Sequence, residues 1–188
     1  MTTLRLRAAL VGAALLLVPP TLAAHAQAPT LAAAPAPRPT DVASADAIIA
    51  ALYDVISGPA GQTRDWDRFR SLFVPGARLI VVRARPDSTG SRAPRVMTPE
   101  QYIETAGTQL ERNGFFEREI AQVSERFGGV THRFSTYDSK RNASDAQPFA
   151  RGINSIQLLN DGTRWWVVTI YWDSERPDNP IPAKYLPR

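Results

Sequence analysis

The sequence predicts a domain of the α+β class, in which a curved antiparallel sheet wraps around N-terminal helices. Two patterns indicate this class. Apolar residues recur at helical spacing in the first part of the domain, whereas the second part alternates long β-branched and aromatic runs with turn signals. A third observation is that the chain has no internal repeat and no glycine-rich phosphate loop, which argues against repeat architectures and phosphate-loop folds.

Three capping residues mark the starts of the predicted helices. Ser44 can cap a first helix through residue 56, and Asp65 can cap a short second helix that ends before a proline–glycine pair. Thr98 is followed by Pro99 and Gln101, the pattern of a capping box, and starts a third helix that an asparagine–glycine pair ends. The side chains expected to be buried share helical spacing: Ile48, Ile49, Leu52, Val55, Ile56, Trp66, Phe69, Leu72, Phe73, Tyr102, Ile103, Ala106 and Leu110.

The remaining domain is predicted to consist of strands. Residues 78–84 form a first strand, and residues 96–97 a short return from a polar loop. The turns at 128–129 and 160–162 are typical of hairpins. Together with a longer polar connection at 140–148, they separate four long strands, predicted over residues 115–127, 130–139, 149–159 and 164–173.

The N-terminus has the three parts of a secretory signal peptide over residues 1–26. Arg5 and Arg7 precede an apolar run at 8–18, and a small-x-small motif at 24–26 follows. The run has 11 residues, whereas a membrane span needs roughly 20. We therefore expect Sec-type export of a bacterial periplasmic or secreted protein, with no stable membrane span after cleavage. The alternative is an uncleaved N-terminal anchor.

Composition sets the domain limits. Residues 27–43 are rich in alanine and proline and predict a disordered linker, which leaves 44–188 as the folded domain. Without Arg5 and Arg7 the chain has 20 basic against 18 acidic side chains, and the basic ones are spread singly. This near balance argues against a nucleic-acid partner.

The residue types that hold metals and prosthetic groups are scarce. The chain has no cysteine, which excludes disulfides, a cysteine-ligated zinc site and a thiol nucleophile. His25 lies in the predicted signal peptide, so the mature chain keeps only His132. The acidic residues show no metal-ligand spacing, and we therefore predict no metal site and no cofactor.

The order of elements is similar to the nuclear transport factor 2-like superfamily, which includes SnoaL-like cyclases, ketosteroid isomerase and scytalone dehydratase. The resemblance covers residues 44–187 and implies a cone-shaped α+β barrel. This fold hosts enzymes and binding modules alike, so no family site residue is carried over. The segment from residues 65–69 into 72–73 contributes to this resemblance. Residues 115–119, 152–158 and 162–166 resemble an exported bacterial subgroup of the superfamily that has no assigned activity.

The hairpin register predicts a candidate catalytic pair. A two-residue turn at 128–129 places Glu125 opposite His132, and directly opposed residues point to the same side of a sheet. The neighbours on that side are mostly apolar, so we expect this side to line the concave pocket. We expect the other side, with Arg133 and Ser135, to face solvent.

On this register His132 would serve as a general acid–base that Glu125 orients, suited to proton abstraction or dehydration. The alternative is a structural, half-solvated pair near the hairpin end. A change of one residue in the turn would also move the two side chains to opposite sides.

Aromatic side chains on the helices and strands suit a pocket for a small hydrophobic, ring-shaped molecule, unless they serve only as core. Asn154 lies in an apolar stretch, where its amide either satisfies the backbone or contacts a ligand. The candidate ligand-binding residues are Tyr53, Trp66, Phe69, Tyr102, Phe134, Asn154 and Trp166.

Three functions remain open: a small-molecule-binding domain of unassigned activity, a cofactor-free lyase or isomerase acting through His132 and Glu125, and a non-catalytic protein-interaction module. The last strand bears on partners because it is apolar on both faces, and such a strand is usually covered on both. Helices would cover one face, and we predict that a second copy covers the outer face in a homodimer. One face of this strand is expected to carry Trp166, Val168 and Ile170, and the other face Trp165, Val167 and Tyr171.

Overall fold

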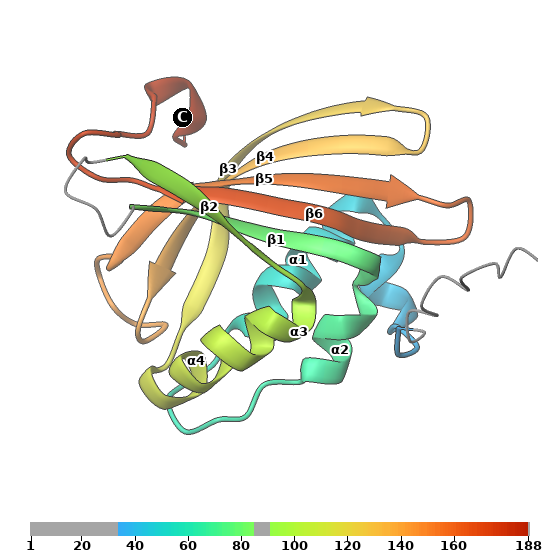
Figure 1. Cartoon of the computed structure of the whole chain (residues 1–188), viewed down its shortest axis with the longest axis horizontal. Coiled ribbons are helices and arrows are strands. Elements are labelled where there is room, and N and C mark those ends of the chain that lie inside the picture. The colour runs from blue at the N-terminus through green and yellow to red at the C-terminus, as the bar shows by residue number, and fades with distance from the viewer. Residues whose placement is uncertain (1–33, 85–90, 188) are drawn as a thin grey trace, which may run out of the picture. The chain divides into compact units, whose positions relative to one another are not determined.

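The six strands of the domain form one sheet, which curves over α1 and has the other helices beneath it (Figure 1). The structure is a computed structural model of the chain and describes residues 34–84 and 91–187. The strand order is β2-β1-β6-β5-β4-β3. The predicted α+β class is thus confirmed. The strands are β1 (Phe73–Ala84), β2 (Arg92–Met97), β3 (Phe116–Phe127), β4 (Val130–Lys140), β5 (Ala150–Asn160) and β6 (Trp165–Ser174).

The helices begin at the three predicted caps. The hydroxyl of Ser44 accepts a hydrogen bond at the start of α1 (Ala45–Ile56), and the carboxylate of Asp65 does so at α2 (Trp66–Ser71). Thr98 and Gln101 form the capping box of α3. The predicted third helix consists of three consecutive segments. These are α3 (Pro99–Tyr102), a π-helical turn η2 (Ile103–Gly107) and α4 (Thr108–Asn113).

Strand pairing departs from the expected antiparallel sheet at one place. The chain β3-β4-β5-β6 is antiparallel throughout, and β2 is antiparallel to β1, but β1 runs parallel to β6. The helical connection from α3 to α4 carries the chain from the β2 edge of the sheet to the β3 edge. The sheet is therefore mixed, with its one parallel pair next to α2, among the residues described.

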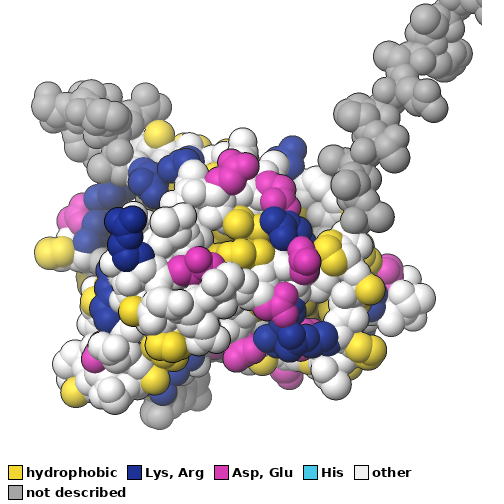
Figure 2. All heavy atoms as spheres, turned by 90° about the horizontal axis from the view of Figure 1, so that it is seen from below, with side chains coloured by type: hydrophobic (Ala, Val, Ile, Leu, Met, Phe, Trp, Pro, Cys, Tyr) yellow, Lys and Arg dark blue, Asp and Glu magenta, His cyan; other side chains and the backbone are white. Residues whose placement is uncertain are grey.

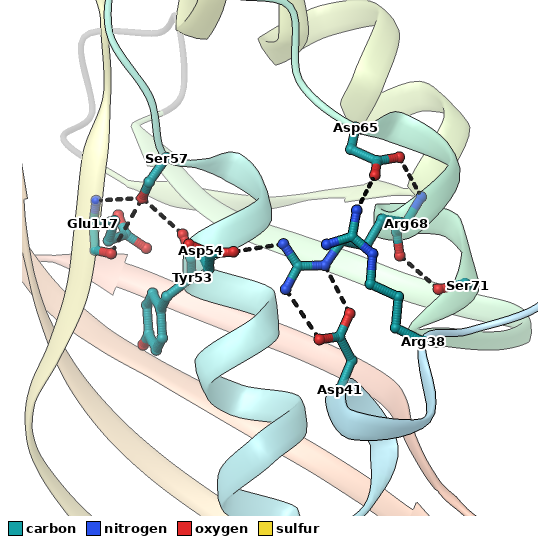
Figure 3. A network of polar contacts seen from close by, with 9 residues as sticks. All are labelled: Arg38, Asp41, Tyr53, Asp54, Ser57, Asp65, Arg68, Ser71 and Glu117. Carbon is teal, nitrogen blue, oxygen red and sulfur yellow. Dashed lines mark hydrogen bonds and ion pairs between the residues drawn. The ribbon is translucent and has the colours of Figure 1, made fainter.

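The folded domain begins before residue 44. A short 3-10 helix, η1 (Pro39–Val42), packs on α1, and Asp41 and Val42 are buried. The carboxylate of Asp41 accepts two hydrogen bonds from Arg68, at 2.7 and 3.0 Å (Figure 3). The last residues of the predicted linker are therefore part of the domain, because this buried ion pair fixes them. The predicted signal peptide lies outside the described residues.

The hairpin between β3 and β4 has the predicted register but the opposite orientation. Glu125 pairs with His132, and Phe127 with Val130, across the two-residue turn. However, the alternate residues of β4 are all buried: Thr131, Arg133, Ser135, Tyr137 and Ser139. Arg133 and Ser135 contact Asp46 and Tyr53 of α1. The expectation that His132 faces the concave side is wrong, because Arg133 and Ser135 on the alternate side are buried with partners from α1 and β3 instead of being solvated.

The outer face of the sheet is partly covered by the chain's own C-terminus. Thr136 donates a hydrogen bond to the carbonyl oxygen of Tyr185 at 2.7 Å, and the rings of Phe134 and Tyr185 lie 4.9 Å apart. Tyr185 belongs to a 3-10 turn, η3 (Ala183–Tyr185). No helix within residues 34–84 and 91–187 is long and apolar enough to cross a membrane.

Candidate functional site

A cavity of about 260 Å³ lies between α1, the inner face of the sheet and α3–α4. Its volume is near the lower end of the range of roughly 300–1,000 Å³ for small-molecule sites. The lining is mainly apolar, with three aliphatic side chains from α1 and α4 (Leu52, Ile56 and Leu110). Seven aromatic side chains complete most of the wall: Tyr53, Phe69, Tyr102, Phe115, Tyr137, Phe149 and Trp172.

The aromatic rings hold one another in place. Tyr102 stacks on Phe69 with centroids 5.5 Å apart and meets Trp172 edge-on at 6.5 Å. Such pairs contribute about 0.5–1.5 kcal/mol beyond burial of their area. On β5, Gly152 makes room for Tyr137, since a Cβ atom at this position would lie 2.4 Å from the tyrosine hydroxyl. The wall is therefore set by packing before any ligand arrives.

Glu117 is the acidic side chain in the cavity wall. A β-bulge in β3 places it there. The pairing shifts between Glu119 and Ala121, so that Ile120 is the extra residue, and Glu117 and Glu119 stand opposite Ser139 and Tyr137. A bulge re-aims the side chains on one side of it. In this case it turns both carboxylates inward.

The surroundings of Glu117 favour the protonated acid. Burial raises its pKa to about 7, nearby Asp138 adds to the increase, and hydrogen bonds from Ser139 and Asn154 partly oppose it. The Ser139 hydroxyl donates to Oε2 of Glu117 at 2.7 Å. A carboxyl group with a pKa near neutrality can change its charge under physiological conditions.

A chain of hydrogen bonds connects the cavity to a buried ion pair. The Asn154 amide donates to the Tyr53 hydroxyl at 3.0 Å, and Tyr53 and Ser135 are 2.7 Å apart. Ser135 donates to Glu119 at 2.5 Å, so its single proton is used and Tyr53 must donate to Ser135. Glu119 also pairs with Arg133. Tyr53 therefore points its proton away from the cavity.

The tyrosines of the wall stay protonated at neutral pH. Burial raises the pKa of Tyr137 to about 12, with Glu117 contributing. Burial and the charge of Glu117 also raise the pKa of Tyr53 and of Tyr102. Because all three are uncharged, Glu117 carries the titration of the cavity near neutral pH.

The backbone around Glu117 is tied to the end of α1. The hydroxyl of Ser57 accepts a hydrogen bond from the Glu117 amide at 3.0 Å and donates to the carbonyl of Tyr53 at 2.7 Å (Figure 3). Two residues of the cavity wall, on α1 and β3, are thus joined through one side chain. This contact fixes the depth at which the carboxylate enters the cavity.

A second, polar hollow adjoins the cavity between α1 and the β3–β4 pair. Tyr53 and Glu117 line both. The polar hollow also holds Arg118 and Arg133, which pair with Asp138 and with Glu119 and Asp46. Glu117 therefore stands at the boundary between an aromatic cavity and a charged groove. Acidic and basic side chains are likewise intermixed over the face shown in Figure 2.

The structure places the predicted catalytic pair away from this cavity. His132 lies on the outer face, where its Nε2 is 3.0 Å from the Ser155 hydroxyl and its ring meets Phe134 edge-on. Glu125 is exposed, and no hydrogen bond joins it to His132 in the described part of the chain. The two residues are opposed as predicted, but on the wrong side of the sheet for the cavity.

Of the predicted ligand-binding residues, Tyr53, Phe69, Tyr102 and Asn154 line the cavity. The other three do not. Trp66 packs edge-on to Phe69 and donates to Glu111 at 3.0 Å, and Phe134 lies against the C-terminal segment. Trp166 donates to Asp161 at 2.7 Å near the β5–β6 turn.

Sequence reasoning missed Glu117 as a site residue. The strand-like pattern of residues 115–127 gives no sign of the bulge, so the side on which each residue projects could not be read from it. In residues 34–84 and 91–187, no cluster of three or more histidine or acidic side chains is arranged to hold a metal ion. The polar atoms that face the cavity come from Glu117, Ser139, Asn154 and the tyrosines.

Comparisons with known proteins show similarity of fold. No protein-family model and no curated protein matches the sequence. A protein of unknown function with a cystatin-like fold from Nostoc punctiforme superposes with a TM-score of 0.50 at 11% identity, covering 71% of this chain and 89% of that one. An uncharacterised protein with a cystatin-like fold from Caulobacter vibrioides gives a TM-score of 0.50 at 14% identity, covering 71% and 88%.

An NTF2-like protein of unknown function from Methylobacillus flagellatus is also similar, with a TM-score of 0.41 at 14% identity, covering 71% of this chain and 95% of that one. At these identities the likeness concerns the fold alone. The two structures that superpose at a TM-score of 0.50 share the α+β fold of this domain, a curved sheet with helices on its inner face. The fold does not assign an activity.

Proposed function

We propose that the domain binds a small, largely apolar molecule in the cavity beneath α1. The observation that carries this proposal is a cavity of about 260 Å³ with an aromatic wall and one partly buried carboxyl group. Apolar walls with a few placed polar groups are typical of ligand sites. The rings supply contact area, and Glu117, Ser139 and Asn154 supply orientation.

A thermal-shift screen of ring compounds, followed by a crystal structure of the best binder, tests the proposal. We expect ligand density against Tyr102 and Trp172. In the variant Ala150→Phe the new ring enters the cavity from its wall and should abolish the shift. The matched change Ala121→Phe, in the strand segment after the bulge and away from the cavity lining, should leave it intact. Ligand density elsewhere, or an equal effect of both variants, would contradict the proposal.

A second candidate is a cofactor-free lyase or isomerase, and the pKa of Glu117 favours it. General bases work best when their pKa is near the working pH, and burial raises that of Glu117 to about 7. In this reading Glu117 takes the role first assigned to His132 and Glu125. Glu117→Gln should then abolish turnover of an identified substrate while His132→Gln leaves it unchanged; the opposite result would restore the His132 hypothesis.

We also propose that two copies associate through the outer face of the sheet. Exposed apolar side chains there support this, in particular Val123, Phe127, Val130 and Tyr171. Sedimentation equilibrium should give a dimer, and Tyr171→Arg should give a monomer with an unchanged fold. A monomeric parent protein would overturn this proposal and leave the cavity proposal untouched.

Export is the remaining proposal, and it rests on residues 1–26 of the sequence. The expected mature protein begins at Gln27 in the periplasm or medium. N-terminal sequencing of the protein recovered from each cell fraction tests this. An intact N-terminus in the membrane fraction would favour the retained anchor.

A further inference from the structure

The carboxyl group in the cavity has no basic partner among the described residues, whereas the acidic side chains beside it do. Glu119 pairs with Arg133, and Asp138 pairs with Arg118. Glu117 lies on the same strand as Glu119 and only accepts hydrogen bonds, from Ser139 and Asn154. When Glu117 is ionised, the cavity therefore holds one uncompensated negative charge.

Among the described residues, the titratable side chains that line the cavity with Glu117 are tyrosines, which are uncharged near neutral pH. Tyr53 faces it from α1, Tyr102 from α3 and Tyr137 from β4, and the acidic Asp138, paired with Arg118, is the nearby charge on β4. The basic side chains nearby are engaged with other groups. Arg118 and Arg133 pair with acidic partners in the adjoining groove, and Lys140 lines that groove and not the cavity. Arg64 donates to the carbonyl oxygens of Ile56 and Leu110, and Arg141 lies over the ring of Phe149. The compensating charge must therefore come from outside the protein or be a bound proton.

The wall around this carboxylate suits one kind of positive charge. Ring faces attract cations, and rings grouped around a space bind alkylated ammonium groups. Tyr102 and Trp172 lie at 82° to each other and Phe115 meets Phe149 edge-on at 6.2 Å, so the rings of the wall have several orientations. Phe149 already has the guanidinium of Arg141 over its ring, 4.0 Å from the centroid, which leaves Tyr102, Phe115 and Trp172 for a ligand. A small hydrated ion would leave this wall without contacts, whereas alkyl substituents would fill it.

We propose that the ligand of this cavity is an organic cation, an ammonium group with apolar substituents, whose charge lies next to the Glu117 carboxylate and whose substituents contact the aromatic wall. This inference rests on the proposed ligand-binding function and names the class of ligand. A neutral molecule that accepts a hydrogen bond from protonated Glu117 is the competing occupant. The affinities of the two occupants change with pH in opposite directions. The cation binds the ionised carboxylate, so its affinity rises with pH, whereas the neutral acceptor binds the protonated acid, so its affinity falls.

Isothermal titration calorimetry at pH 5.5 and pH 8 tests the inference with three probes. Benzyltrimethylammonium and choline carry the charge, and 3,3-dimethylbutan-1-ol is the uncharged isostere of choline. We expect the cations to bind roughly 30-fold more tightly at pH 8 than at pH 5.5, since Glu117, whose pKa is raised to about 7, ionises between these values. The alcohol should bind at least about tenfold more weakly than choline at pH 8.

Two variants make the result specific to the cavity. Glu117→Gln keeps the shape and the hydrogen-bond acceptor and should remove the pH dependence and most of the cation affinity. Glu104→Gln removes the same charge from an exposed position on η2 and should change neither. Circular dichroism of each variant confirms that it is folded.

The outcomes separate the two proposals. Equal binding of choline and its isostere, or affinity that falls as pH rises, would overturn the organic cation and leave a ligand-binding cavity. If the cations bind equally to Glu117→Gln, the charge lies elsewhere and the inference is wrong. If neither these probes nor any compound of the ring screen binds in the cavity, the proposed function itself fails.

Discussion

The two faces of the sheet combine polarity and burial in opposite ways. The inner face of β4 is rich in polar side chains, yet Arg133, Ser135 and Ser139 are buried beneath α1 and bonded to partners. The outer face is more apolar, yet Phe127 is 90% exposed and Val130 58%. Polarity alone therefore does not tell which face of this sheet is the core.

This difference between the faces explains why the candidate site lies on the inner face. Polar groups can be buried there because α1 and β3 bring matching partners, such as Asp46 and Glu119 for Arg133. Within this paired surface Glu117 is the acidic group that lacks a basic partner in the described residues, and it faces the aromatic cavity. Within the part of the chain that the structure describes, the hydrogen bond of the His132 side chain on the outer face is the one between its Nε2 and the Ser155 hydroxyl.

The largest effect is expected at the buried ion pair of the inner face. In Arg133→Met the carboxylate of Glu119 loses its main partner while the side chain of residue 133 stays buried. We expect the free energy of unfolding to fall by about 3–5 kcal/mol, as when one partner of a buried pair is removed. Urea unfolding followed by circular dichroism measures this.

The control for that experiment is Arg112→Met, which removes an exposed charge from α4 and should change the free energy of unfolding by no more than about 0.5 kcal/mol. If Arg133→Met costs no more than this control, the inner face is not held by its ion pair, and the contrast between the faces fails.

The next effect concerns the pH dependence of stability. The folded state raises the pKa of Glu117 from 4.5 to about 7. It therefore binds a proton more tightly than the unfolded state does, and the free energy of unfolding falls as pH rises from about 4.5 through 7. This group lowers the free energy of unfolding by at most about 3 kcal/mol over that range.

Urea unfolding at pH 4.5 and pH 8 tests this. The difference in the free energy of unfolding between the two pH values should be smaller for Glu117→Gln than for the parent protein. An identical pH dependence in both proteins would show that Glu117 does not titrate in this range.

A smaller, matched comparison uses two serines on opposite faces. Ser135→Ala leaves the Tyr53 hydroxyl and Glu119 with one partner fewer in a buried network, and should cost about 1–3 kcal/mol. Ser155→Ala removes the hydroxyl next to His132 on the half-buried outer face, and should cost less than about 1 kcal/mol. Thermal unfolding of the two variants gives the order. The reverse order would mean that the contact between His132 and Ser155 on the outer face matters more than the inner network.

Local signals predicted much of this fold. The caps at Ser44, Asp65 and Thr98 are chemical signatures that act over three or four residues, and each starts a helix where expected. The register of the β3–β4 hairpin followed from a two-residue turn. These features depend only on residues close together in the chain, which is why they can be predicted from the sequence.

The candidate site depended on contacts that are distant in the sequence. The bulge at Ile120 turns Glu117 inward, and α1 supplies the partners that bury Arg133; neither follows from local alternation. Asp41 joins the domain through an ion pair with Arg68, which composition could not reveal. The aromatic cavity residues Phe69 and Tyr102 were predictable because helical spacing placed them on the buried side of their helices.

The most direct test of the central claim, that the inner face holds a carboxyl group without a basic partner in an aromatic cavity, is the pKa of Glu117 itself. Side-chain carboxyl carbon-13 NMR, with the Glu117 signal assigned by its loss in Glu117→Gln, follows this group from pH 3 to pH 9. The account predicts a midpoint near 7, as burial without a basic partner requires. A midpoint at 4.5 or below would show that the carboxylate is solvated or paired with a base, and would contradict the account.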